Sequence, residues 1–299
     1  MENDKVGGTM NRRLAGCVDL HLHSTYSDGT LTPAALVAEA AGIGLRAIAL
    51  ADHDNLDGIA EAEAAGVRHG VEIVSGVELS VVWGELRDLH LLGYAFDRNH
   101  PGLHAALAEF RAFRTNRNRL ILERINARLA EEGRPPLDFD TVAARAGGTV
   151  GRPHLGRALI SAGYVRDMEG AFSSYLTPCN VPKRYFPADD AIALVHAAGG
   201  CAVLAHPIFI GDDPAVLPGL IDTLIGHGLD GMETWCGGAS NDTVDRLLTL
   251  ARRKGLIATG GSDFHQPGAG PALGCGLGNL RIPYRCVEEL RQRAGRYRA

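Results

Sequence analysis

The residues of this chain best suited to chemistry are histidines and carboxylates set in short apolar segments. His21 and His23 alternate with Leu20 and Leu22, so a β-strand here would place both imidazoles on one face, within reach of one ion. An imidazole without a partner is costly to bury. The pair alone is a weak signal, because hydrogen-bonded core histidines are common, but it indicates where a metal site would begin.

Groups of the same kind recur at the places where later strands are expected to end. Together these groups are more numerous than the ligands of a single ion. Their number suits two or three divalent ions joined by a bridging carboxylate. No cysteine joins them, and mixed imidazole and carboxylate ligands favour Mn²⁺, Zn²⁺ or Fe²⁺ over a cysteine-rich structural zinc site. Of these metals we expect Mn²⁺. The nine candidate ligands are His21, His23, Asp28, His53, Glu78, His90, His206, Asp263 and His265.

Short apolar runs alternate with helical patterns, which is typical of an α/β fold with parallel strands. Thr32 followed by Pro33 predicts the start of the first helix. In βα barrels the carboxyl ends of the strands form the active site, and the candidate ligands lie at or beside these ends. The seven predicted strands lie near residues 17–23, 46–51, 71–75, 88–94, 202–205, 231–234 and 256–259.

The alternation stops between residues 98 and 185, where no clear strand is predicted. A long arginine-rich helix is expected at about 103–132, and a second helical pattern lies around 154–163. Long interruptions of this kind are usually functional. We therefore expect an inserted helical subdomain at 98–185, within a metal-binding domain formed by 16–97 and 186–299.

The ordered motifs resemble those of the PHP (polymerase and histidinol phosphatase) family over nearly the whole chain. The resemblance implies a distorted (β/α)7 barrel that holds up to three divalent ions and hydrolyses phosphoesters. The motifs that carry it are His21-Leu22-His23-Ser24, Tyr26-Ser27-Asp28-Gly29, Ala51-Asp52-His53-Asp54, Gly76-Val77-Glu78, His90-Leu91-Leu92-Gly93, Ala205-His206-Pro207 and Gly261-Ser262-Asp263-Phe264-His265.

The same resemblance implies how the ligands are shared among the ions. Glu78 would bridge the first and second ions, and Asp28 stands where many relatives have histidine, which adds one negative charge. Asp263 and His206 are the candidate catalytic groups, because either could assist the leaving oxygen. The first ion would be held by His21, His23, Glu78 and Asp263, the second by Glu78, His90 and His206, and the third by Asp28, His53 and His265.

Residues of the insert resemble one branch of this family, the 3′,5′-nucleoside bisphosphate phosphatases and the 5′–3′ exonucleases that act on short 5′-phosphorylated oligonucleotides. The likeness implies a substrate with two phosphates, one at the metals and one held by the insert. Arginine binds phosphate with two hydrogen bonds, and lysine adds a point charge. The candidate substrate-binding residues are Arg117, Asn118, Arg152, His154 and Lys183.

The composition limits the partners and the location. The chain has 299 residues and a net charge of −5, which argues against bulk binding of long nucleic acid but not against a small phosphorylated ligand. Six cysteines without a CxxC pair predict buried thiols in a reducing cytoplasm. No secretory signal and no membrane span are visible. No protein partner can be inferred.

Three alternatives stay open. A histidinol-phosphate phosphatase belongs to the same family, although Asp28 and the arginine-rich insert argue against it. Hydrolysis of an amide or lactone uses similar metals but leaves the basic insert unexplained. A non-catalytic metal-binding or nucleotide-binding module would have lost ligands, whereas all nine positions hold competent groups.

Overall fold

Two β-sheets form the centre of the molecule. The computed structural model describes residues 16–146, 150–210, 216–268, 272–273 and 281–298. One sheet is parallel and has the order β1 (Val18–Leu22), β2 (Ala47–Leu50) and β3 (Glu72–Val74). The other is mixed and has the order β6 (Phe186–Pro187), β4 (Gly76–Trp83), β5 (Leu86–Tyr94), β7 (Cys201–Leu204), β8 (Gly231–Cys236) and β9 (Ile257–Gly261).

The two sheets approach each other at both edges. On one side the Asp263 N–H donates to the His21 carbonyl at 2.9 Å, and the His23 N–H donates to the Phe264 carbonyl at 3.0 Å. On the other side the Asp54 N–H donates to the Glu78 carbonyl at 2.9 Å. The first two bonds join the end of β1 to the segment that follows β9, and the third joins the segment that follows β2 to β4.

The predicted α/β class is confirmed, but the sheet is not the all-parallel array that the sequence pattern suggested. β4 pairs antiparallel with β5, and β5 pairs antiparallel with β7. The sequence pattern does not predict β4, because Ser75 alone separates it from β3 and Gly76 resembles a turn. Its alternating residues Val77, Leu79 and Val81 are fully buried, which identifies it as a strand with one core-facing side.

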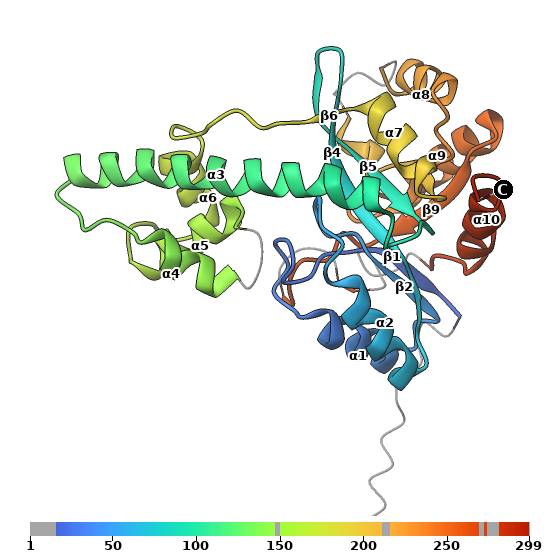
Figure 1. The fold of residues 1–299 in the computed structure, drawn as a ribbon, viewed down its shortest axis with the longest axis horizontal. Helices are drawn as coiled ribbons and strands as arrows, with labels where there is room; N and C mark the ends of the chain where they lie inside the picture. Colours follow the sequence, from blue (N-terminus) through green and yellow to red (C-terminus); the bar gives the residue numbers. More distant parts are fainter. Residues whose placement is uncertain (1–15, 147–149, 211–215, 269–271, 274–280, 299) are drawn as a thin grey trace, which may run out of the picture.

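Helices cover both sheets (Figure 1). Helix α1 (Pro33–Ile43) begins as predicted, with the Thr32 hydroxyl accepting from the Ala35 N–H at 3.2 Å, and ends at Gly44, whose φ of 85° glycine adopts readily. The helices beside the first sheet are α1 and α2 (Ile59–His69), and those beside the second are α7 (Ala188–Ala197), α8 (Val216–Gly226), α9 (Asn241–Lys254) and α10 (Arg285–Ala294).

A single long helix, α3 (Pro101–Glu131), leaves the sheets and carries the remaining helices along its far half (Figure 1). Near its start Leu103 and Leu107 pack into the core beneath the second sheet. Farther along, Ile121 and Ile125 belong to a separate core shared with the small helices. These are α4 (Phe139–Ala146), α5 (Arg152–Ser161), α6 (Met168–Ala171) and the π-helical turn η1 (Phe172–Leu176).

Two further observations bear on location. Among the described helices none is long and apolar enough to cross a lipid bilayer. The five cysteines that the structure describes are buried and free of disulfides, namely Cys17, Cys179, Cys201, Cys236 and Cys286.

Candidate metal centre

All nine candidate ligands gather where the two sheets meet, although two of them arrive by an unexpected route. Glu78 lies near the start of β4, and His90 lies in the middle of the antiparallel strand β5. The expectation that Glu78 follows the end of a strand is therefore wrong, whereas His90 lies within a strand as predicted, although that strand is antiparallel to both neighbours. The β4–β5 hairpin brings them together instead, because Ser80 pairs with His90 and Glu78 with Leu92 across the ladder.

Glu78 occupies the middle of the cluster and offers a different oxygen to each side. Its Oε1 lies 2.8 Å from His90 Nδ1 and 2.9 Å from His206 Nε2. Its Oε2 lies 2.9 Å from His53 Nδ1 and 3.4 Å from His23 Nε2. A carboxylate with histidines at both oxygens has the arrangement required of a bridge between two cations.

Asp263 completes one side of the cluster. Its Oδ1 lies 3.1 Å from His23 Nε2 and 3.5 Å from His21 Nε2. Both histidines are fully buried, whereas the Asp263 side chain is 34% exposed. One donor atom each from His21, His23 and Glu78 lie within 4.8 Å of one another, a spacing that fits one ion.

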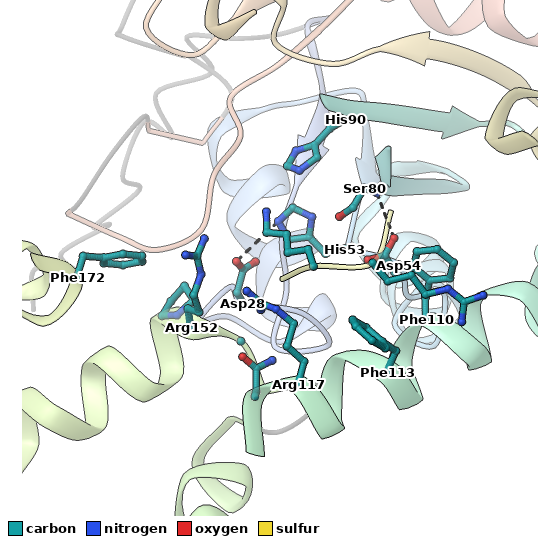
Figure 2. Close-up of a pocket in the computed structure, with 15 residues that line it drawn as sticks. Asp28, His53, Asp54, Ser80, His90, Phe110, Phe113, Arg117, Arg152 and Phe172 are labelled. Carbon is teal, nitrogen blue, oxygen red and sulfur yellow. Dashed lines mark hydrogen bonds and ion pairs between the residues drawn. The ribbon is translucent and has the colours of Figure 1, made fainter. Parts of the chain in front are cut away.

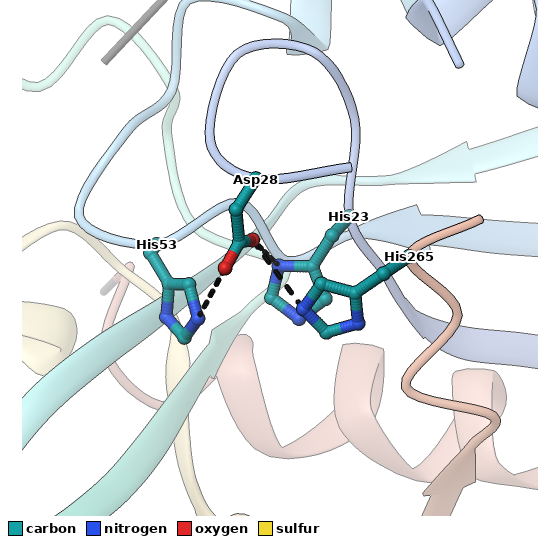
Figure 3. A group of neighbouring side chains, drawn as sticks. All are labelled: His23, Asp28, His53 and His265. Atoms are coloured by element: carbon teal, nitrogen blue, oxygen red, sulfur yellow. Dashed lines mark ion pairs between the residues drawn. The ribbon is translucent and has the colours of Figure 1, made fainter. Parts of the chain in front are cut away.

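Asp28 anchors a second group beside the first (Figure 3). Its Oδ1 lies 3.3 Å from His265 Nε2 and 3.7 Å from His23 Nδ1, and its Oδ2 lies 3.8 Å from His53 Nε2. One atom from each of these four residues falls within 4.8 Å of the others. His23 and His53 therefore face both the Glu78 group and the Asp28 group.

The buried polar atoms of this cluster fit divalent cations. His21 Nε2, His23 Nε2 and Glu78 Oε2 are buried and accept or donate no hydrogen bond. Unsatisfied buried groups of this kind are rare in native proteins and call for an explanation such as an ion. A set of imidazole nitrogens and carboxylate oxygens at this spacing supplies one.

The electrostatics of the cluster favour the metal-binding forms of two central ligands, Glu78 and His23. Burial would raise the pKa of Glu78, but His90 and His53 hold it well below its usual range. Burial and the neighbouring His265 lower the pKa of His23 to about 4. Near neutral pH Glu78 is thus an anion and His23 is a neutral imidazole, which are the forms that coordinate metals.

Carboxylates behind the cluster orient the ligands. Glu233 in β8, fully buried, faces His21 Nδ1 at 3.1 Å through Oε1, while its Oε2 accepts from the His206 backbone N–H at 2.6 Å. Asp52 accepts from the Ser24 N–H at 2.7 Å and so fixes the turn that leads to Asp28. Outer partners of this kind set the tautomer and direction of ligating histidines.

Backbone strain is concentrated at the same place. His206 has φ 25°, Asp263 has φ 57° and Asp54 has φ 51°, values that residues other than glycine adopt infrequently. Such conformations cost about 1–3 kcal/mol each and persist where the surrounding structure enforces them. Here the bonds to Glu233 and between the two sheets do so.

A cleft of about 770 Å³ opens directly onto the cluster (Figure 2). Asp28, His53 and His90 form one wall. Four of the five predicted substrate-binding residues line the cleft, namely Arg117, Asn118, Arg152 and Lys183. The fifth, His154, does not: its Nδ1 accepts from the Gly151 N–H at 2.9 Å at the start of α5, and it lines a different cavity within the insert.

Several of these polar side chains are held by the insert itself. Arg117 donates to the Val181 carbonyl at 2.7 Å and to Asn180 Oδ1 at 2.8 Å, and Asn118 donates to the Val150 carbonyl at 2.7 Å. The contacts of Arg117 and Asn118 connect α3 to the chain segments on either side of α5 and α6. Lys183 instead forms an ion pair with Asp88 of β5, outside the insert.

Arg152 lies across the cleft and is the least constrained of the cations. Its guanidinium lies 5.4 Å from the centre of the Phe172 ring, and within the described chain it forms no ion pair with an acidic residue. Sequence reasoning did not find Phe110, Phe113 and Phe172, which also line the cleft. No local pattern separates such aromatic residues from core residues.

Comparison with known proteins agrees with this geometry. A model of the PHP domain matches residues 19–131. A 5′-3′ exoribonuclease of Haemophilus influenzae is 37% identical over 83% of this chain and 90% of that protein. The chain belongs to the PHP family. A 3′,5′-nucleoside bisphosphate phosphatase of Chromobacterium violaceum is a second PHP relative, 36% identical over 85% of this chain and 88% of the relative.

A solved structure supports the same assignment. A protein of Bifidobacterium adolescentis, described as a metal-dependent phosphoesterase, superimposes with a TM-score of 0.79 at 32% identity, covering 92% of this chain and 96% of its own. The family resemblance inferred from the motifs is confirmed, and this PHP protein is a metal-dependent enzyme that hydrolyses phosphoesters.

Proposed function

We propose that this enzyme hydrolyses the phosphate ester of nucleoside 3′,5′-bisphosphates, for example adenosine 3′,5′-bisphosphate to AMP and phosphate. The observation that carries the proposal is that one cleft is shared by candidate metal ligands and by phosphate-binding cations. His53 and His90 stand on one side, and Arg117 and Arg152 on the other (Figure 2). A substrate with two phosphates would contact both sides at once.

The metal ligands are proposed in the sets that the family motifs imply, with Glu78 as the bridge, and two or three divalent ions, Mn²⁺ foremost and Zn²⁺ or Fe²⁺ as alternatives. Ions held there would supply positive charge to the phosphoryl oxygens and lower the pKa of the attacking water. The central place of Glu78 between His23, His53, His90 and His206 supports this sharing.

The protein's own contribution is to orient the substrate and to handle the proton of the leaving oxygen. We assign the proton to Asp263 and His206, whose side chains are 34% and 14% exposed. Arg152 and Lys183 would hold the second phosphate, and Arg117 and Asn118 would shape that end of the cleft. Fixed donors and positioning supply most of the rate in phosphoryl transfer.

The finer features of the fold fit this function. We interpret the two sheets as one distorted barrel of the (β/α)7 type, built from residues 16–97 and 186–299, and residues 98–185 as the substrate-binding insert. The hydrogen bonds between the sheets at both edges support a nearly closed ring. The buried free thiols support a reducing, cytoplasmic location.

A second activity, 5′–3′ removal of nucleotides from short 5′-phosphorylated oligonucleotides, is favoured by the exposed aromatic ring of Phe113 in the cleft. Its side chain is 37% exposed and lines the cleft together with Phe172. Bases stack on aromatic rings with little regard to sequence, at about 1–3 kcal/mol each. An oligonucleotide could therefore continue beyond the first nucleotide.

A substrate panel with Mn²⁺ tests the proposal. The panel compares adenosine 3′,5′-bisphosphate, AMP, histidinol phosphate and a short 5′-phosphorylated RNA, and phosphate and nucleotide products are identified by chromatography. We expect the bisphosphate to give the highest kcat/KM, with AMP and histidinol phosphate far lower because they lack a second phosphate for the cations. A higher kcat/KM for histidinol phosphate than for the bisphosphate would overturn the assignment.

A further inference from the structure

A groove on the outside of the second sheet is separate from the site described above. It lies between α9 and α10, next to each other in Figure 1, and encloses about 1260 Å³ including its open mouth. None of the residues that line it lines the catalytic cleft or belongs to the metal cluster. The relationship of this chain to phosphoesterases gives the groove no role.

The rim of the groove is strongly basic in a protein whose net charge is −5. Four arginines line it against a single acidic residue, Glu289. Arg285 pairs with Glu289 at 2.6 Å, and Arg293 pairs with the buried Asp230 at 3.0 Å. The remaining two, Arg252 from α9 and Arg296 beyond α10, both line the groove and have no acidic partner among the described residues.

One aromatic side chain lines the groove. Trp235 of β8 is only partly buried and lines the groove beside Ile257 and Ala258 of β9. The pairing of β8 with β9 shifts between Glu233 and Trp235. Because of this irregularity Glu233 can face the metal cluster while Trp235 lines a groove between the outer helices.

We propose that this groove binds a second nucleotide, a mononucleotide whose base lies against Trp235 and whose phosphate is held by Arg252 and Arg296. Two guanidinium groups without acidic partners favour a phosphate, and a partly exposed indole favours a flat aromatic ring. The two features together favour a nucleotide over inorganic phosphate, which has no ring, and over an acidic peptide, which has no planar base.

The test uses the intrinsic fluorescence of Trp235, which lines the groove. The chain has two tryptophans, so Trp83→Phe leaves Trp235 as the only indole. The Mn²⁺-loaded Trp83→Phe protein is titrated with AMP, ribose 5-phosphate and inorganic phosphate, and the stoichiometry of AMP is measured by calorimetry. We expect AMP to change the fluorescence saturably and ribose 5-phosphate to bind about tenfold or more weakly, since it lacks the stacking base.

Two variants locate the binding site. Arg252→Glu with Arg296→Glu should weaken AMP binding to Trp235 by about 100-fold, because two charge-assisted contacts are replaced by repulsion. Arg253→Glu is the matched control, since Arg253 is exposed on the same helix and does not line the groove, and it should leave the Kd unchanged. Phosphatase activity, measured in parallel, reports that each variant is folded.

Each of three contrary results would refute the proposal. No fluorescence change at millimolar AMP excludes a nucleotide in the groove. Equal affinity for AMP and inorganic phosphate excludes the base as a determinant. An unchanged Kd in the Arg252 and Arg296 double variant, or an equal loss in the Arg253 variant, excludes the two arginines as the phosphate site. The outcome is independent of which substrate the catalytic cleft prefers.

Discussion

Glu233 provides the sharpest test of how the protein prepares its metal centre. It holds two ligands at once, facing the ring of His21 at 3.1 Å and accepting from the backbone N–H of His206 at 2.6 Å. Partners behind metal ligands are typically worth about 10–100-fold in metal affinity or activity, which corresponds to about 1.4–2.7 kcal/mol. Glu233 is itself fully buried, so water cannot replace it without rearrangement.

The two contacts of Glu233 predict different effects for its substitution by glutamine and by alanine. In Glu233→Gln one carboxylate oxygen becomes an NH₂ group, which cannot accept, so one of the two contacts is lost and we expect about a tenfold weaker Mn²⁺ affinity. In Glu233→Ala both contacts are lost, and we expect about a 100-fold weaker affinity. The affinity is measured by titrating chelator-treated protein with Mn²⁺ and following phosphate release and heat.

Glu72→Gln serves as the control, because Glu72 is also a strand carboxylate but contacts Tyr284 and Arg291 instead of the metal ligands. It should lower thermal stability and leave the Mn²⁺ midpoint unchanged. If both Glu233 variants keep the wild-type midpoint, or if Glu72→Gln shifts it equally, the idea that Glu233 orients His21 and His206 is wrong.

Four further predictions follow from the site and the core. Asp263→Ala should abolish phosphate release while circular dichroism shows an intact fold, and retained turnover would contradict a role for Asp263. Arg152→Ala should raise KM for the bisphosphate more than for p-nitrophenyl phosphate, whereas equal losses would remove Arg152 from substrate binding. Chelation should stop activity and Mn²⁺ should restore it, and full activity of metal-free protein would exclude the metal mechanism. Asp230→Ala should lower the free energy of unfolding by about 3–5 kcal/mol, because it removes a buried partner of His196 and Arg293.

The Asp230 variant also predicts a pH dependence. Burial would raise the pKa of Asp230, but hydrogen bonds from His196 and Tyr297 lower it. A carboxyl whose pKa is lowered by folding stabilises the protein above its unfolded pKa of about 3.9 and loses that contribution as pH falls through the folded value. Urea unfolding of both proteins should therefore show a large stability difference at pH 7 that shrinks below about pH 4. A constant difference would contradict this linkage.

The residues of the metal cluster could be predicted from the sequence better than the strands that carry them and the side chains that orient them. The two-residue period around His21 and His23 is visible because β1 has one face toward the core and one toward the cluster. Glu78 and His90 were found by motif, but the hairpin that joins them was not, since a one-residue break before β4 looks like a turn. Glu233 could be suspected from its place at the end of a predicted strand, yet only the fold shows that it contacts two ligands.

The cleft was harder to predict, because it is made by residues distant in sequence. Arg117 and Arg152 come together only through the packing of α3 with α5, and Phe172 joins them from a π-helical turn. His154 shows a different limit of local sequence patterns. It belongs to a motif that predicts phosphate binding, but its ring accepts a hydrogen bond from the Gly151 N–H and so caps the start of α5. Local pattern cannot separate a capping histidine from a ligand-binding one when both stand next to a glycine.

The length of α3 has a consequence for substrate choice. At 31 residues the helix is about 46 Å long, and one end is anchored in the main core while the other lies in the core of the insert. Proline occurs only at its first position, so it lacks the usual cause of a kink. The rigid helix therefore sets the distance between the metal centre and the cations of the insert before substrate binds. The enzyme would select substrates by the spacing of their phosphates.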